Sequence, residues 1–253
     1  MEYQKKLTIP APPYGRRFAI TDVHGCLQTL EALVWEQIQL QPEDQLFFLG
    51  DYIDRGPSSG GVIDFILQLQ DKGYPVYALR GNHEQTLLDD YDLHDGERFK
   101  IVMTKFKKTP DLLNEFGELR LRYLEFCRSL PYYIDTDDFL LVHAGFDFGA
   151  ENTFEEWHAM LWIRKYFPPP LTKLQMIAMM EKPKRIVHGH TPHSISEIMD
   201  RAKNQDIILP LDNGCVFGGV ARGKFTVNDL GRLCALNLDT FEILTQDRLD
   251  EVL

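Results

Sequence analysis

The sequence predicts an α/β fold with parallel strands, and the repeated order of strand, loop and helix is the main indication. The apolar run Phe18–Ile20 precedes apolar residues at helical spacing over Leu27–Ile38. The run Leu46–Leu49 precedes a second helical pattern over Val62–Leu69, and Val76–Leu79 is typical of a third strand. Because helices separate these strands along the chain, we expect the strands to pair in parallel.

The rest of the chain predicts a helical cover followed by more strands. Residues Gln85–Leu130 are mostly helical and charged in pattern, and a polar turn between Tyr132–Ile134 and Phe139–Val142 indicates a hairpin. Pro168–Pro170 interrupts a helix on either side. Four later runs are typical of strands: Arg185–Val187, Ile207–Leu209, Leu233–Leu238 and Phe241–Leu244. Residues 1–15 are rich in Pro and Gly and predict an extended arm before a single domain over 16–253.

Composition excludes several classes of protein. A chain of 253 residues with 44% apolar residues can bury one substantial core. The formal charge of −11 argues against a nucleic-acid partner, because contact with phosphate backbones needs a basic face. The four cysteines form no CxxC pair, so neither a disulfide scaffold nor a cysteine zinc site is indicated. Without a signal-peptide pattern or a membrane-length apolar run, we expect a cytoplasmic monomer with no membrane contact.

Polar side chains of the types that bind metal and phosphate follow five of the predicted strands. The five clusters are Asp22-Val23-His24-Gly25, Gly50-Asp51-Tyr52-Ile53-Asp54-Arg55-Gly56, Arg80-Gly81-Asn82-His83-Glu84, His143-Ala144-Gly145 and His188-Gly189-His190-Thr191-Pro192. Open α/β sheets place their sites outside the carboxyl ends of the strands, so these clusters are expected to meet. Asp22 and His24 are two residues apart, so in an extended chain their side chains face the same way and both can reach a single metal ion.

These motifs are too specific to be a coincidence of composition. At average residue frequencies the tetrapeptide GNHE should occur by chance on the order of once in a thousand chains of this length. The motifs resemble those of the phosphoprotein phosphatase family of the calcineurin-like metallophosphoesterases, in its bacterial serine/threonine phosphatase branch. The resemblance extends from Arg16 to the C-terminus. It implies a four-layer αββα sandwich, in which two central mixed β-sheets are flanked by helices.

The same resemblance implies a dinuclear metal centre. The implied ligands are Asp22 and His24 on the first ion, Asp51 as the bridge, and Asn82, His143 and His190 on the second. A mixed set of oxygen and nitrogen donors suits Mn, Fe or Zn better than Mg or Ca, which prefer all-oxygen sites. Of these, Mn is the expected metal, with Fe or Zn as alternatives. Two such ions would activate a hydroxide for attack on phosphorus.

The resemblance also assigns roles around the metals. Arg55, Arg80 and Arg164 are implied to bind the phosphate oxygens, which a guanidinium fork fits better than an ammonium does. His83 is implied to protonate the leaving oxygen. Asp54 is implied to orient the His83 ring and to favour the imidazolium, as the aspartate of a catalytic triad does.

Three functions fit these motifs, and the first is favoured by the sequence. It is the hydrolysis of phosphoserine and phosphothreonine in proteins, with small phosphate esters as further substrates. The alternative is the hydrolysis of dinucleoside polyphosphates such as diadenosine tetraphosphate, because relatives with that activity share the DxGC region followed by two glycines, seen here from Asp212 to Gly219. Those relatives resemble GDxxARG and GNHD, however, whereas this chain has Asp54 and Glu84. A binding module without catalysis is the third.

Overall fold

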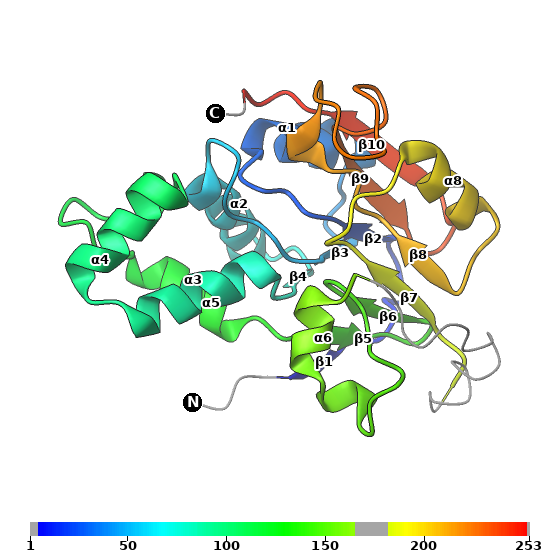
Figure 1. Cartoon of the computed structure of the whole chain (residues 1–253). Helices are drawn as coiled ribbons and strands as arrows, with labels where there is room; N and C mark the ends of the chain where they lie inside the picture. The colour runs from blue at the N-terminus through cyan, green and yellow to red at the C-terminus, as the bar shows by residue number, and fades with distance from the viewer. Residues whose placement is uncertain (1–4, 165–181, 252–253) are drawn as a thin grey trace.

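The computed structural model describes residues 5–164 and 182–251, and two five-stranded sheets form its centre (Figure 1). The first sheet has the order β1 (Lys6–Thr8), β5 (Tyr133–Asp135), β6 (Phe139–Val142), β7 (Arg185–His188) and β8 (Ile208–Pro210). The second has the order β10 (Ile243–Asp247), β9 (Arg232–Asn237), β2 (Arg17–Ile20), β3 (Gln45–Phe48) and β4 (Val76–Ala78). Parallel and antiparallel pairs occur in both, so both sheets are mixed as predicted.

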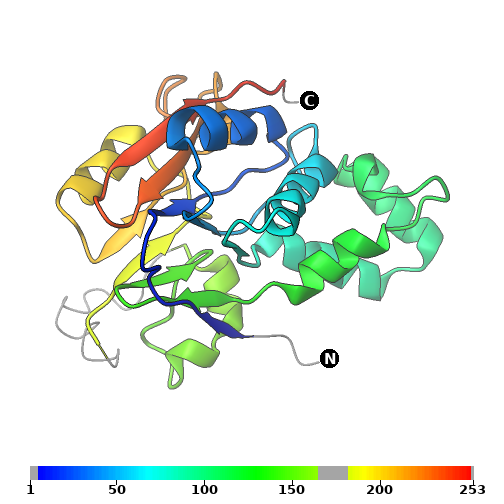
Figure 2. The ribbon, with the colours of Figure 1, turned by 180° about the vertical axis from the view of Figure 1, so that it is seen from behind.

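Helices flank the sheets, and a separate helical group extends to one side (Figure 2). The flanking elements are α1 (Leu27–Ala32) with its continuation η1 (Leu33–Ile38), α2 (Ser59–Asp71), η4 (Thr153–Glu155), α6 (Trp157–Trp162), α8 (Ile195–Lys203) and η5 (Cys215–Phe217). The side group contains α3 (Asn82–Leu93), α4 (Gly96–Ile101), η2 (Val102–Phe106), η3 (Pro110–Leu112) and α5 (Leu121–Ser129). It lies within the range Gln85–Leu130 that was predicted to be a helical cover, except that α3 begins earlier, at Asn82. Among the described residues, no helix is both long and apolar enough to span a bilayer.

Each central strand buries both of its faces, which explains why the strands are continuous apolar runs in the sequence. In β3, Leu46 and Phe48 pack into the core that contains the residues of α1 and α2. Phe47 and Leu49 point the other way, into the core shared by the two sheets. Since successive side chains of a strand alternate between faces, one strand contributes to two cores.

Two local differences from the sequence-based expectations have physical causes. Within the predicted N-terminal arm, Lys6–Thr8 pairs in parallel with β5 as an edge strand, and three residues are too few to show a periodic pattern. The last strand begins at Ile243 because Phe241 adopts a left-handed φ of 63° in the preceding turn. The predicted interruption at Pro168–Pro170 lies outside the described residues.

Hydrogen bonds between loops hold the strand ends together at one edge of the two sheets. The N–H groups of Val23 and His24 both donate to the Asp51 carbonyl, at 3.1 and 2.9 Å. The N–H of Gly189 donates to the His143 carbonyl at 2.8 Å, which links the loops that follow β6 and β7. The backbone therefore fixes the relative positions of the loops before any side chain is considered.

Candidate active site

The backbone of the candidate site is strained at the residues that carry its chemistry. His24, Asp51, Asp54, Arg55 and His190 all have left-handed φ angles, between 47° and 72°. This conformation is uncommon for residues other than glycine and costs of order 1–3 kcal/mol at each position. Such strain persists only where the surrounding fold enforces it, so these five side chains are aimed by the structure around them.

One group of the predicted metal ligands gathers around Asn82. Its Oδ1 lies 2.9 Å from His143 Nε2 and 2.9 Å from His190 Nδ1. The other ring nitrogen of His143, Nδ1, donates to the Leu49 carbonyl at 2.8 Å. That bond places the ring proton of His143 on Nδ1, so Nε2 presents its lone pair to the site.

A second group gathers on the other side of Asp51. His24 binds the Ile53 carbonyl through Nδ1 at 2.9 Å, and its Nε2 lies 3.5 Å from Asp51 Oδ2. The other carboxylate oxygen, Oδ1, lies 3.5 Å from His143 Nε2. Asp51 belongs to both groups, His24–Asp51–His83 and Asp51–His143–His190, whose ligand atoms lie within 4.8 Å of one another. This is the position that a bridging carboxylate requires.

Asp22 lies at the edge of this arrangement. Its carboxylate accepts the His190 N–H at 3.0 Å and the Thr21 hydroxyl at 2.9 Å, and it belongs to neither of the two groups among the described residues. Gly189 permits this approach, because a Cβ on Gly189 would lie 2.1 Å from Asp22 Oδ1. Its assignment as a metal ligand remains a prediction.

The pKa shifts reflect the crowding of buried carboxylates and imidazoles, which a bound cation would relieve. Burial, with a further contribution from Asp212, raises the pKa of Asp22, and burial together with Asp22 raises that of Asp51. Burial also lowers the pKa of His24 and His143, and burial and then Arg164 lower that of His190 to about 3. Neutral imidazoles, an amide oxygen and crowded carboxylates suit divalent transition ions, so the residues fit a dinuclear metal site.

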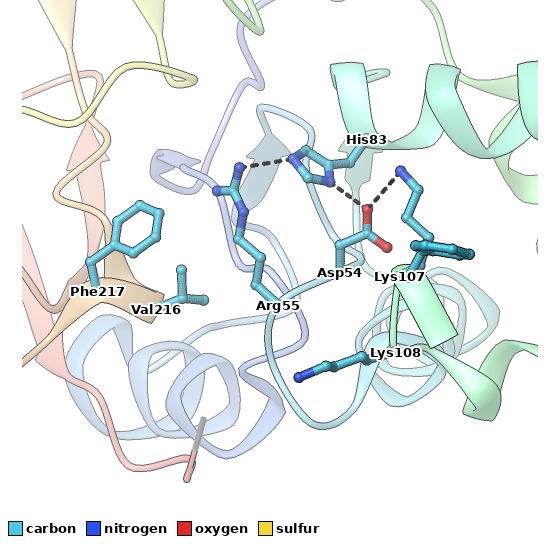
Figure 3. A pocket seen from close by; sticks show the side chains of 8 residues that line it. Asp54, Arg55, His83, Lys107, Lys108, Val216 and Phe217 are labelled. Atoms are coloured by element: carbon cyan, nitrogen blue, oxygen red, sulfur yellow. Dashed lines mark hydrogen bonds and ion pairs between the residues drawn. The ribbon is translucent and has the colours of Figure 1, made fainter. Parts of the chain in front are cut away.

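His83, a member of the group His24–Asp51–His83, also forms a pair with Asp54. His83 donates from Nδ1 to Asp54 Oδ2 at 2.6 Å, and its Nε2 accepts from Arg55 Nη2 at 3.0 Å (Figure 3). Arg55 also donates from Nη1 to His24 Nε2 at 2.6 Å. Burial lowers the pKa of His83 and outweighs the hydrogen bond that His83 donates to Asp54, which raises this pKa. Asp54 therefore supports the imidazolium as expected, but the net shift is downward.

The three predicted phosphate-binding arginines lie in different surroundings. Arg55 faces His83 and lines the pocket in front of it. Arg80 is fully buried, and its guanidinium donates to Gln85 Oε1 at 2.9 Å and to the Arg128 carbonyl at 3.0 Å. Arg164 lines a separate small cavity with His188. The structure thus brings one of the three next to His83, and phosphate binding by all three stays a prediction.

Comparison with known proteins identifies the family. A family model described as calcineurin-like phosphoesterase matches residues 16–226. The chain belongs to the calcineurin-like phosphoesterases. It is therefore a hydrolase of the metallophosphoesterase type, and members of this family use a dinuclear site of divalent metal ions.

Proteins that are similar to this chain differ in the activities that their names state. A bis(5'-nucleosyl)-tetraphosphatase of the asymmetrical type from Bacillus velezensis is 30% identical over 226 residues, which cover 81% of this chain and 86% of the relative. A cold-active protein-tyrosine phosphatase from a Shewanella species is 20% identical, with a TM-score of 0.61 over 95% of this chain and 82% of the other. A protein serine/threonine phosphatase from Saccharomyces cerevisiae is 14% identical, with a TM-score of 0.60 and coverages of 98% and 84%. The two structural likenesses show the fold alone.

Glu84 and Asp212 also shape this metallophosphoesterase site, although their motifs predicted no role for either residue. The Glu84 carboxylate accepts the N–H groups of Asp51, Tyr52 and Gly81 at 2.8–2.9 Å, and burial raises its pKa to about 7. Asp212 accepts the Gly214 N–H at 2.6 Å, and burial raises its pKa to about 6. The only sequence feature that could have pointed to Glu84 and Asp212 is their place inside the motifs GNHE and DNGC.

Proposed function

We propose that this protein hydrolyses dinucleoside polyphosphates, and diadenosine tetraphosphate is the substrate to test first. The Bacillus velezensis relative carries this proposal, because its name states that activity and the match extends over most of both chains. The arrangement of Asp51 between two ligand groups, with His83 beside them, supports the class of reaction, which is the attack of water on phosphorus.

The residues divide the work of this reaction. Asp22, His24, Asp51, Asn82, His143 and His190 would hold two divalent ions, for which we propose Mn²⁺. When bound, such a pair acidifies a shared water and neutralises charge on the phosphate. Arg55 donates from Nη1 to His24 Nε2 and from Nη2 to His83 Nε2, and the same two donors would turn to non-bridging phosphate oxygens when substrate binds between the rings. His83 stands where it can give a proton to the leaving oxygen, and Asp54 keeps its ring oriented.

A second candidate function is the hydrolysis of phosphoserine or phosphothreonine, and the His83–Asp54 pair favours it. A serine alkoxide is a poor leaving group that needs a proton, so a short bond between imidazole and carboxylate is most useful there. The oxygen that leaves from a phosphoanhydride is already a stable anion and depends less on that proton. Motif comparison alone gave this function priority, and the relatives support the dinucleoside polyphosphates better.

A comparison of three substrates, each assayed alone, tests the proposal. The Mn²⁺-loaded protein is incubated separately with diadenosine tetraphosphate, a phosphoserine peptide and 4-nitrophenyl phosphate, and kcat/KM is measured for each. We expect the largest value for diadenosine tetraphosphate, with nucleotide products on chromatography. A larger kcat/KM for the phosphopeptide, with no cleavage of the dinucleotide, would instead support the second candidate.

A further inference from the structure

A pocket of about 400 Å³ opens in front of the His83–Asp54 pair (Figure 3). Its volume lies within the range of pockets that bind small molecules. It is lined by Asp54, Arg55, His83, Phe106, Lys107, Lys108, Val216 and Phe217. Five of these residues have no role in the chemistry described above, and they come from η2, the turn after it, and η5. The pocket is therefore more than the catalytic site itself.

The position of the proton donor indicates what this pocket holds. A general acid must lie within hydrogen-bond reach of the oxygen that leaves. His83 lines the pocket, so the group attached to that oxygen extends from the scissile phosphorus into the space between Lys107 and Phe217 (Figure 3). The pocket is thus the place of the leaving group, whatever its chemistry.

The charge of the pocket selects an anionic leaving group. Lys107 Nζ lies 3.5 Å from Asp54 Oδ2 and 4.0 Å from Asp90 Oδ2. Lys108 has no ion-pair partner among the described residues, and Arg55 adds a third cation to a lining with a single carboxylate. In a chain with a formal charge of −11, a locally positive pocket is a specific feature. Phosphate groups beyond the scissile bond would bind here better than a neutral peptide would.

An aromatic wall faces these lysines and fits a planar base. Phe217 lies on the other side of Arg55 from Lys107 (Figure 3), with the Arg55 and Arg222 guanidinium carbons 5.3 and 3.9 Å from its ring centroid. Phe106, which is 76% exposed, also lines the pocket. Stacking of a nucleobase on an aromatic ring is worth about 1–3 kcal/mol. Lysines on one side, and an aromatic ring flanked by the guanidinium groups of Arg55 and Arg222 on the other, offer contacts to both the phosphates and the base of a nucleotide.

We propose that Lys107, Lys108 and Phe217 form a subsite for the leaving nucleotide, an inference that rests on the proposed function. The lysines bind the phosphates beyond the scissile bond, and Phe217 stacks on the base. In the reaction, the oxygen of water forms the new bond to phosphorus and its proton passes to solvent. The P–O bond of the anhydride breaks, and its electron pair leaves on the bridging oxygen as a phosphate oxygen of the departing nucleotide. The lysines stabilise this charge.

The test of the lysines compares two substrates in the Mn²⁺-loaded, full-length protein. Diadenosine tetraphosphate has phosphates beyond the scissile bond, whereas 4-nitrophenyl phosphate has none. A hydrogen bond to a charged group contributes about 1.5–3 kcal/mol. Lys108→Gln should therefore lower kcat/KM for diadenosine tetraphosphate, relative to kcat/KM for 4-nitrophenyl phosphate, by about tenfold or more, mainly by raising KM for the dinucleotide. Lys105→Gln is the matched control, since Lys105 is an exposed lysine of η2 outside the pocket lining.

The test of the aromatic wall uses a substrate without a base. Phe217→Leu should lower kcat/KM for diadenosine tetraphosphate by about fivefold or more relative to that for inorganic tripolyphosphate, because only the dinucleotide can stack. Calorimetric titration with ADP should show that Lys108→Gln and Phe217→Leu each bind ADP more weakly than the wild type, by factors similar to those expected for kcat/KM.

The outcomes separate the subsite from the proposed function. If wild-type protein cleaves diadenosine tetraphosphate but the Lys108→Gln and Phe217→Leu ratios change less than twofold, the subsite is wrong and the function stands. If the wild type leaves the dinucleotide intact, the proposed function fails first. If Lys108→Gln selectively slows an acidic phosphopeptide instead, the pocket recognises peptide and the nucleotide subsite is overturned.

Discussion

Gly189 offers the sharpest structural test of the candidate site, because the space for its side chain is already taken. A Cβ at this position would lie 2.1 Å from Asp22 Oδ1, whereas ordinary contact begins at 3.4 Å. In Gly189→Ala the carboxylate must therefore move by about 1 Å. The movement also disturbs the bonds from the His190 N–H to the same carboxylate, so it cannot be a free rotation of Asp22.

The cost of this movement can be placed on a scale. A misplacement of 1 Å in a catalytic site can reduce the rate about 100-fold, which is ~2.7 kcal/mol of transition-state stabilisation. We expect kcat/KM for 4-nitrophenyl phosphate to fall by that factor and the Mn²⁺ concentration for half-maximal activity to rise. Both are measured in one titration of activity against Mn²⁺, with the melting temperature as the measure of folding.

Gly96→Ala is the matched control for this experiment. It is also a glycine-to-alanine change, but a Cβ on Gly96 would meet no atom within 4 Å. Its activity and Mn²⁺ requirement should stay within twofold of the wild type. A folded Gly189→Ala protein with wild-type kcat/KM and Mn²⁺ dependence would refute the placement of Asp22 at the site.

Three further predictions concern proton donation, acid stability and metal binding. His83→Asn should slow an alkyl phosphate by about 10²–10⁴-fold but 4-nitrophenyl phosphate much less, because only the alkoxide needs the proton; equal losses in steady-state rates would contradict this. Burial alone would raise the pKa of Asp44, but hydrogen bonds from Arg16 and Gln41 hold it below its usual value. The stability that Asp44 contributes is therefore present above the unfolded pKa near 3.8 and is lost as pH falls through the folded value. In urea unfolding, Asp44→Asn should cost about 1–3 kcal/mol at pH 7, and the difference from the wild type should shrink in acid; a difference constant with pH would refute the role of the charge. Dialysis against EDTA should lower the melting temperature, and Mn²⁺ at about 100 times its Kd should restore about 2.7 kcal/mol; an unchanged melting temperature would contradict metal binding by the folded state.

The meeting of distant motifs could be predicted from the sequence because parallel strands fix where their ends lie. His143 and His190 are 61 and 108 residues from Asn82, yet all three follow or begin elements at the same edge of the sheets. Each apolar run identified a strand, and each following motif then had a known place. Side-chain identity and strand direction were sufficient for this part of the site.

The surroundings of the site could not be predicted in the same way. Lys107 lies 53 residues from Asp54 and carries no motif, so its approach depends on how the helical side group packs. Glu84 was visible in GNHE, but its bonds to the Asp51 and Tyr52 N–H groups depend on a loop from another strand. Properties that depend on packing between segments require the structure, whereas properties set by a motif and its strand do not.

Anomalous X-ray diffraction from crystals of the Mn²⁺-loaded protein tests the central claim most directly. The account predicts two peaks, one on each side of the Asp51 carboxylate and about 3.5–4 Å apart, with one adjoining His24 and the other adjoining His143 and His190. A single peak, or two peaks that do not share Asp51, would contradict the account.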